Sequence, residues 1–339
     1  MRIPGTRRTG RARHSGRPRR LRRCLAAVAV LFAVWATTTG AGGRLDPYHR
    51  PAAVPALSAT TLAARYKDNR RTIAQALRTA ERVRDRDRIR VFSAFLRPGR
   101  RFLAFDPRGS GRAVEVIGDL AAARRVVVLV PGADTTLTTF DTHGGKPYSA
   151  PGGDARALYD EAARLSAHPG LAVVAWLGYR PPTTMRPDAV TDERADAGAA
   201  ALRRFVAGVG RVNPAARTAL FCHSYGSVVC GEAARGLPTT EIVAFGSPGM
   251  SSPSGAALGT RARIWAGRGT GDWTRLLPHL RVWGMGHGAD PVSRTFGARV
   301  FDAGNAGHSD YLRPDSLSLR NLTLIALDRD VEVTRAGAA

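Results

Sequence analysis

The stretch T-A-L-F-C-H-S-Y-G-S-V-V, residues 218–229, decides how the rest of this chain is interpreted. Its apolar first half predicts a short strand, and the small residues around Ser224 predict a sharp turn into a helix. This is the pattern of a nucleophile elbow, G-x-S-x-G, with Cys222 in place of the first glycine. Five residues match often by chance, so Ser224 is a candidate nucleophile only if an acid and a histidine follow in suitable places.

The composition argues against a nucleic-acid partner. The net charge of +24 is uneven, because residues 1–41 contain ten arginines and no acidic residue, which leaves about +14 for the rest of the 339 residues. Lys67 and Lys146 are the only lysines, and no arginine–aromatic stripe or zinc-knuckle spacing is present. The remaining positive charge would favour an anionic envelope surface.

The first 43 residues have the pattern of an export signal. An arginine-rich stretch precedes an apolar run at 24–36, and small residues follow at 37–43. The run is short for a spanning helix, which needs about 20 residues. We therefore expect residues 1–43 to be an export signal or an uncleaved signal-anchor, with membrane contact through residues 24–36. The protein would then be exported, and either secreted or anchored at the outer face of the cytoplasmic membrane.

Residues 44–98 are expected to form a linker and an N-terminal helical region. Prolines mark the linker at 44–56. From about residue 58 to residue 87, apolar residues recur at helical spacing, with a break expected near 68–69. We favour a structural role for this region at the edge of the following domain over a role as a cap on a pocket.

Residues 99–330 alternate apolar strands with helices, which predicts one α/β domain. The expected strands are 102–106, 113–117, 126–130, 171–177, 217–222, 241–245, 263–266 and 298–302, and the expected helices are 152–167, 188–208, 225–235 and 315–327. Runs that are apolar throughout indicate strands buried on both faces of a mostly parallel sheet, with helices on both sides. Ligands bind such sheets at the carboxyl ends of the strands.

An acid and a histidine do follow Ser224, each after a later strand. In α/β hydrolases the order along the chain is Ser, then Asp or Glu, then His. Here Asp272 follows the seventh expected strand and His308 follows the eighth. Asp290, in the long connection before the last strand, is the alternative acid. We favour Asp272 because the end of a strand fixes a carboxylate better than a long loop does.

The remaining candidates are neighbouring histidines and backbone amides. His223 lies next to the nucleophile, but its side chain is expected to point away from the base position, so we interpret it as local packing. His279 and His287 could line a pocket. An oxyanion hole needs preorganised N–H donors. The expected donors are the backbone amides of Tyr225, at the start of the elbow helix, and Ala133, in the loop after the third strand.

No metal or cofactor motif is present: the sequence has no HExxH, no paired CxxC, no Walker loop and no suitably placed G-x-G-x-x-G. We therefore expect neither a metal nor a cofactor. Cys222 and Cys230 flank the elbow and are expected to lie near each other. They would be either a disulfide, if the protein is exported, or two small buried thiols.

Six motifs together carry a resemblance to a known family. They are C-H-S-Y-G-S at 222–227, V-L-V-P-G at 128–132, W-L-G-Y-R-P-P at 176–182, G-S-P-G at 246–249, F-G-A-R at 296–299 and G-H-S-D-Y-L at 307–312. The chain resembles a bacterial, actinobacterial-type family of predicted α/β hydrolases of unknown function, which usually carry G-H-S-Y-G-S. The resemblance covers roughly residues 100–325. It implies an α/β-hydrolase fold with a triad of Ser224, an Asp and His308, and it implies no particular substrate.

The sequence therefore predicts a serine hydrolase that cleaves an ester or similar acyl bond through an acyl-enzyme. Its substrate would be a small-molecule or lipid-like acyl compound. Two alternatives stay open at this point: an acyltransferase on the same fold, and a catalytically silent cell-envelope binding protein. The sequence predicts no oligomeric state.

Overall fold

The computed structural model describes residues 46–184, 193–277, 279, 281–282 and 285–337. The expected export signal or anchor at 1–43, including the apolar run at 24–36, lies outside the described residues. Within the described part of the chain, no helix combines the length and the apolar character needed to cross a membrane.

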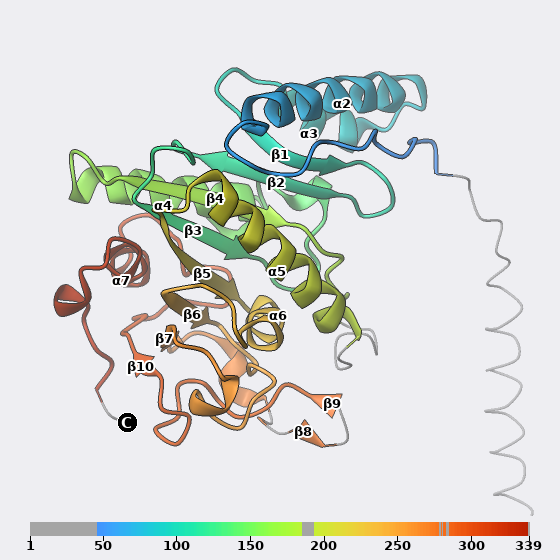
Figure 1. The fold of residues 1–339 in the computed structure, drawn as a ribbon. Coiled ribbons are helices and arrows are strands. Elements are labelled where there is room, and N and C mark those ends of the chain that lie inside the picture. Colours follow the sequence, from blue (N-terminus) through green and yellow to red (C-terminus); the bar gives the residue numbers. More distant parts are fainter. Residues whose placement is uncertain (1–45, 185–192, 278, 280, 283–284, 338–339) are drawn as a thin grey trace, which may run out of the picture. The chain divides into compact units, whose positions relative to one another are not determined.

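The centre of the structure is an eight-stranded sheet with the order β1-β2-β4-β3-β5-β6-β7-β10 (Figure 1). The strands are β1 (Arg101–Asp106), β2 (Arg112–Ile117), β3 (Arg125–Val130), β4 (Leu171–Leu177), β5 (Arg217–His223), β6 (Glu241–Phe245), β7 (Arg263–Gly267) and β10 (Arg299–Val300). β2 pairs antiparallel with β1 and with β4, and the other neighbouring strands are parallel. The predicted mostly parallel sheet is confirmed, and β4 and β6 have the bounds expected from the sequence.

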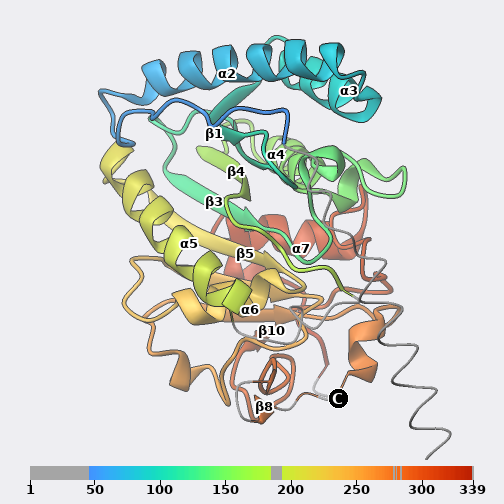
Figure 2. The same ribbon diagram turned by 90° about the vertical axis from the view of Figure 1, so that its right-hand side faces the viewer.

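Helices cover both faces of this sheet, as Figures 1 and 2 show. They are α4 (Pro151–Leu165), α5 (Glu193–Val212), α6 (Gly226–Ala233) and α7 (Leu317–Ala326). In β3, Val127 and Leu129 belong to the core that includes α4 and α7, whereas Val126 and Val128 belong to the core that includes α5 and α6. Each face of the strand is thus buried, which explains why its sequence is apolar without alternation.

The N-terminal helical region differs from the expectation in where it is broken. Helix α2 (Leu62–Arg82) is continuous through residues 68–69, where a break was expected. Asn69 is buried there, and its side-chain amide donates to the carbonyl of Arg65 at 2.8 Å, so this polar residue stabilises the helix instead of ending it. The chain turns after α2, and α3 (Arg86–Phe95) begins with Asp85 accepting a hydrogen bond from the Arg88 amide.

The C-terminal edge of the sheet also differs from the expectation. The last strand is only Arg299–Val300, shorter than the expected 298–302, and it pairs parallel with β7. The connection before it contains a two-stranded hairpin, β8 (Arg281–Val282) and β9 (Met285–Gly286), which the sequence did not indicate. A strand of two residues is too short to leave a periodic signal in the sequence.

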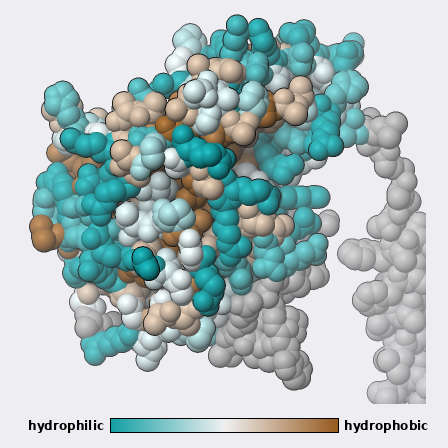
Figure 3. Space-filling model, in the orientation of Figure 1, coloured by the Kyte–Doolittle hydropathy of each residue, from teal (hydrophilic) through white to brown (hydrophobic). Residues whose placement is uncertain are grey.

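Hydrophilic residues predominate on the face shown in Figure 3, and the hydrophobic residues visible there form only small, separate patches. The apolar side chains of the sheet and its helices are instead inside, in the two cores on either side of the sheet.

Candidate active site

Ser224 is held on a strained turn between β5 and α6. Its φ of +51° lies in the left-handed region of backbone conformation, which residues other than glycine rarely adopt. Its backbone amide donates a hydrogen bond to the carbonyl of Phe245 at 3.1 Å. Two glycines permit this turn. A Cβ on Gly226 would lie 2.3 Å from the carbonyl oxygen of Val130, and a Cβ on Gly132 would lie 2.6 Å from the Cβ of Ser224. The end of β3 and the start of α6 therefore close around the serine.

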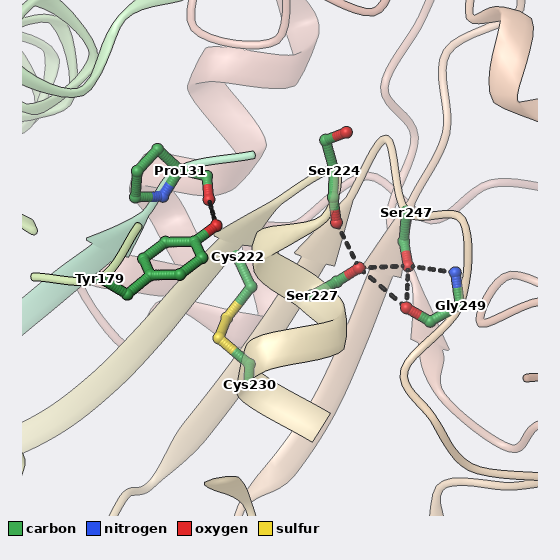
Figure 4. Close-up of a disulfide and its surroundings, with 8 residues drawn as sticks. All are labelled: Pro131, Tyr179, Cys222, Ser224, Ser227, Cys230, Ser247 and Gly249. Carbon is green, nitrogen blue, oxygen red and sulfur yellow. Dashed lines mark hydrogen bonds between the residues drawn. A yellow bond between two sulfur atoms is a disulfide. The ribbon is translucent and has the colours of Figure 1, made fainter. Parts of the chain in front are cut away.

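A disulfide and two buried serines near the start of α6 further stabilise the elbow (Figure 4). Of the two states left open by the sequence, the structure has the disulfide: Cys222 and Cys230 are bonded, with their Cα atoms 6.5 Å apart, and both are fully buried. The hydroxyl of Ser227 lies 2.6 Å from the carbonyl oxygen of Ser224 and 2.6 Å from the hydroxyl of Ser247. In Figure 4 the side chain of Ser224 points away from these groups.

A hydrogen-bonded chain runs from Ser224 through His308 to Asp272. The Nε2 atom of His308 lies 2.9 Å from the Oγ of Ser224, and its Nδ1 lies 3.0 and 3.1 Å from the two carboxylate oxygens of Asp272. Because a carboxylate only accepts, Nδ1 carries the proton and Nε2 is free to accept from the serine hydroxyl. This is the arrangement in which a histidine can take a proton from a serine.

Asp272 is fully buried and yet ionised. Burial by itself raises the pKa of a carboxyl group. Here the hydrogen bond from His308 and the electrostatic attraction of the His308 ring lower the pKa of Asp272. The hydroxyl of Tyr311 also donates to Oδ2 at 2.6 Å, and the amide of Thr274 donates to Oδ1 at 2.8 Å. Together these donors hold the pKa of Asp272 well below its usual range. The carboxylate is therefore able to orient His308 without accepting its proton.

Tyr311 was not identified from the sequence, although it lies within the motif at 307–312. Its ring is almost completely buried, and its hydroxyl both donates to Asp272 and accepts from the amide of Gly269 at 3.1 Å. Burial and the neighbouring carboxylate raise the pKa of Tyr311 far above its ordinary value, so the hydroxyl keeps its proton. Tyr311 thereby ties the loop that carries His308 to the carboxylate that contacts it.

Asp290 lies in a different environment from Asp272. Its Oδ2 is 2.7 Å from a guanidinium nitrogen of Arg268, and its Oδ1 accepts from the amide of Val292 at 3.1 Å. The nearby His279 is 3.6 Å from the same carboxylate through Nε2 and hydrogen-bonds the carbonyl of Pro248 through Nδ1 at 3.0 Å. The structure thus brings Asp272, and not Asp290, to His308.

His223 departs from the expected orientation. Its ring does not point away from the base position but packs against that of His308, with centroids 4.9 Å apart. Its Nε2 lies 2.8 Å from the backbone carbonyl oxygen of His308, and since a carbonyl only accepts, this nitrogen donates. Burial, together with the neighbouring His308, lowers the pKa of His223 to about 3, so the ring is neutral. His223 is the last residue of β5 and lies on the same face of the strand as Phe221, where its ring also packs against that of Tyr311. The expectation was wrong because the sequence does not show that the loop carrying His308 packs on this face.

Ser224 and His308 open into a cavity of about 500 Å³. The described lining residues are Pro131, Gly132, Ala133, Asp134, Thr135, His143, Ser149, Pro151, Asp154, Thr184, His223, Ser224, Tyr225, Pro248, Trp273, Thr274, Leu277, Gly286, His287, His308 and Ser309. Both residues expected to supply oxyanion donors, Ala133 and Tyr225, are among them. His287 lines this cavity as well, whereas His279 is not among its described lining residues.

The loop that carries Ala133 is anchored to the chain that follows β4. The hydroxyl of Tyr179 donates to the carbonyl of Pro131 at 2.7 Å, as Figure 4 shows. Asp134, with a φ of +60°, donates its amide to the carbonyl of Pro182 at 2.9 Å, and its carboxylate accepts from the amide of Thr184 at 3.1 Å. These contacts position the backbone after β3 beside the serine.

Over the residues that the structure describes, no group of three or more His, Cys, Asp or Glu side chains is arranged to hold a metal ion.

Comparison with protein families gives the class of protein. A family model described as alpha/beta hydrolase matches residues 106–282, which is just over half of the chain. The sheet order, the elbow after β5 and the chain order of Ser224, Asp272 and His308 agree with that match. The chain therefore belongs to this α/β-hydrolase family, and the predicted fold class is confirmed.

Two uncharacterised mycobacterial proteins and a solved structure are among the proteins similar to this chain. An uncharacterised protein of Mycobacterium tuberculosis is 28% identical over 66% of this chain and 38% of its own length. An uncharacterised protein of Mycobacterium bovis is 32% identical over 46% of this chain and 59% of its own length. The chain thus spans about two fifths to three fifths of these relatives. A protein of Thermoplasma acidophilum described as a predicted CIB-like hydrolase has a solved structure with a TM-score of 0.42 at 16% identity, over 68% of this chain and 96% of its own.

Proposed function

We propose that this protein is a serine hydrolase that cleaves an ester or similar acyl bond through an acyl-enzyme. The observation that carries the proposal is the hydrogen-bonded chain from the Oγ of Ser224 through His308 to Asp272, at 2.9 and 3.0 Å. This series of hydrogen bonds ends at Ser224, which has a positive φ and lines a cavity of about 500 Å³. A serine displayed in this way is available to a bound substrate, whereas an ordinary structural serine is not.

In the first half of the proposed reaction, the Oγ of Ser224 attacks the carbonyl carbon and its proton passes to Nε2 of His308. The carbonyl oxygen becomes an oxyanion, which accepts hydrogen bonds from the backbone N–H groups of Tyr225 and Ala133. Asp272 holds the Nδ1 proton in place and stabilises the imidazolium that forms. Collapse of the intermediate expels the alcohol, which takes the proton from Nε2, and leaves the acyl group on Ser224.

In the second half, water takes the place of the alcohol. His308 removes a proton from this water, whose oxygen attacks the acyl carbon. The same two amides again hold the oxyanion, and the proton returns from His308 to the Oγ of Ser224 as the carboxylic acid leaves. If an acceptor alcohol or amine displaced water at this step, the outcome would be acyl transfer.

The test is labelling with a fluorophosphonate probe, followed by hydrolysis of p-nitrophenyl esters of increasing acyl length. Wild-type protein should be labelled and should release p-nitrophenol. Ser224→Ala should lose the label and lower kcat by a factor of about 10⁴ to 10⁶. The matched control is Ser93→Ala, at an exposed serine of α3, which should behave as the wild type does.

Folded wild-type protein that is not labelled would overturn the proposal and would favour a catalytically silent binding protein. Labelling without net hydrolysis, but with ester formed when an acceptor alcohol is added, would favour an acyltransferase. The proposed substrate is a small-molecule or lipid-like acyl compound. Export, with secretion or anchoring at the outer face of the cytoplasmic membrane, remains a proposal that rests on residues 1–43 alone.

A further inference from the structure

Asp154 places a carboxyl group with an unpartnered oxygen in the wall of the cavity. It lies in the first turn of α4, and it also lines a small recess that it shares with His223 and His308. Its Oδ1 is completely buried, and no hydrogen-bond partner for it occurs among the residues that the structure describes. Burying a polar atom without a partner costs free energy. A role of Asp154 in function would explain why the acid is nevertheless present at this position.

The position of Asp154 in α4 does not explain its burial. An acid in the first turn stabilises a helix when it is ionised. Here burial raises the pKa of Asp154 well above its usual range, against a smaller opposing effect of the Ala150 backbone. The enclosed Oδ1 without a partner also disfavours a charged carboxylate, so both observations favour the protonated form. The start of α4 is closely packed, because a Cβ on the neighbouring Gly153 would lie 1.6 Å from the carbonyl oxygen of Pro147. A protonated carboxyl has a hydrogen to donate.

The described lining of the cavity around Asp154 carries no fixed positive charge. None of its described lining residues is Lys or Arg, although the chain has 51 such residues. The other acid in the lining, Asp134, is already bonded to Thr184. Apolar surface comes from Trp273 and Leu277, in the connection after β7. Such a lining suits an uncharged ligand that has both hydrocarbon and a polar group, and not an anion.

We propose that Asp154 is a specificity-determining residue that donates a hydrogen bond to an uncharged oxygen of the substrate. This oxygen is a hydroxyl, ether or carbonyl oxygen outside the bond that is cleaved. The inference rests on the proposed hydrolase activity and deepens it: the preferred substrate is an ester that carries such an oxygen, and not a plain hydrocarbon ester.

Two matched pairs of esters test this inference on the full chain, with acid release followed in a pH-stat. In the first pair, 2-hydroxyethyl butyrate differs from propyl butyrate by a hydroxyl in place of a methyl group on the alcohol side. In the second pair, ethyl methoxyacetate differs from ethyl butyrate by an oxygen in place of a methylene on the acyl side. The quantity compared is the ratio of kcat/KM for the oxygen-containing ester to kcat/KM for its hydrocarbon partner.

Asp154→Leu should lower this ratio about tenfold or more in at least one pair, because the donor is lost. Asp154→Asn keeps a donor and should stay within about threefold of the wild-type ratio. Asp154→Ser should also lower the ratio, because the shorter serine side chain does not place its hydroxyl where the carboxyl group lies. This second variant provides the test if Asp154→Leu folds poorly. The matched control is Asp160→Leu, at an exposed position of the same helix, which should leave the ratio unchanged.

Thermal unfolding separates this role from a structural one. If Asp154 is retained for the substrate, Asp154→Leu should raise Tm or leave it unchanged, because it removes an unpaired buried polar group. Unchanged ratios in both pairs would overturn the inference, whatever the Tm. A lower Tm together with unchanged ratios would show that Asp154 has a structural role instead.

Fluorophosphonate labelling of each variant keeps the two proposals apart. Labelled variants with unchanged ratios would overturn the role of Asp154 and leave the hydrolase proposal in place. Wild-type protein that is neither labelled nor active on any of the four esters would overturn both.

Discussion

The two sides of the candidate active site are built in different ways. The nucleophile side is local: the strand, the turn at Ser224 and the helix all lie within residues 218–229, and Cys222 and Cys230 are joined only eight residues apart. The acid–base side is assembled from distant segments. His308 is 36 residues from Asp272 and 84 residues from Ser224.

This difference shows how each side is stabilised. On the nucleophile side, neither Gly132 nor Gly226 has room for a Cβ atom, so the end of β3 and the start of α6 are held close to Ser224. On the acid–base side, hydrogen bonds from Tyr311 and Thr274 hold the carboxylate that meets His308. His223 links the two sides, because it belongs to β5 and donates to the backbone of the His308 loop. Apart from Ser224 itself, variants should therefore affect catalysis most on the acid–base side and stability most on the nucleophile side.

After the loss expected for Ser224→Ala, the largest effect is expected at the acid. Asp272→Asn should lower kcat for p-nitrophenyl butyrate by a factor of about 10³ to 10⁴, because an amide cannot hold the same tautomer of His308 or stabilise its charged form. Asp290→Asn is the matched control and should stay within about threefold of wild type, since Asp290 pairs with Arg268 instead. Loss of turnover in the Asp290 variant alone would reverse the assignment.

The next largest effect is expected at the disulfide. Replacing Cys222 and Cys230 together by alanine should lower the free energy of unfolding by about 2–3 kcal/mol, the usual contribution of a bond that closes a loop of this size. The measurement is urea denaturation with and without dithiothreitol. Turnover should fall only a few-fold, because the contacts of Gly226 and Gly132 also hold Ser224 in place.

Reductant provides the control for the disulfide. It should bring the wild type close to the double variant and leave the variant itself unchanged. If the variant loses turnover as completely as Ser224→Ala while remaining folded, the elbow depends on the disulfide for its geometry, and the comparison drawn above fails.

The smallest effect is expected at His223. Its pKa is lowered to about 3 in the folded state, whereas an unfolded histidine titrates near 6.5. Between these values the unfolded state binds more protons, so this residue makes stability fall as pH decreases from about 6.5 and has no such effect above it. His223→Phe should remove this dependence and gain about 2–3 kcal/mol relative to wild type at pH 4.5, compared with pH 7.5.

Urea denaturation at several pH values measures the effect at His223. Curves of stability against pH that run parallel in the variant and in wild type would contradict a neutral, buried His223. Turnover should drop a few-fold at pH 7.5, because the His308 loop loses one donor, and this drop should be far smaller than that of Asp272→Asn.

Much of the fold could be predicted from the sequence because its signals are local. Buried parallel strands need continuous apolar runs, and β4 and β6 were predicted with their observed bounds. The turn at Ser224 needs small neighbours, and Gly226 meets that requirement. Features without a local signal were missed or misplaced, such as the two-residue strands β8 and β9 and the position of the break after α2.

The sequence by itself determined the α/β class, the elbow at 218–229 and the order of Ser224, Asp272 and His308 along the chain. These features could be predicted because hydrophobic periodicity, small residues and strand ends can each be recognised within a short stretch of sequence. Only the tertiary structure decided which acid meets His308, that Cys222 and Cys230 are bonded, that His223 faces His308, and that Asp154 lies in the cavity wall with a buried, unpaired oxygen. These outcomes depend on distances between segments that are far apart in the chain, and burial and hydrogen bonding across such distances follow from the folded arrangement.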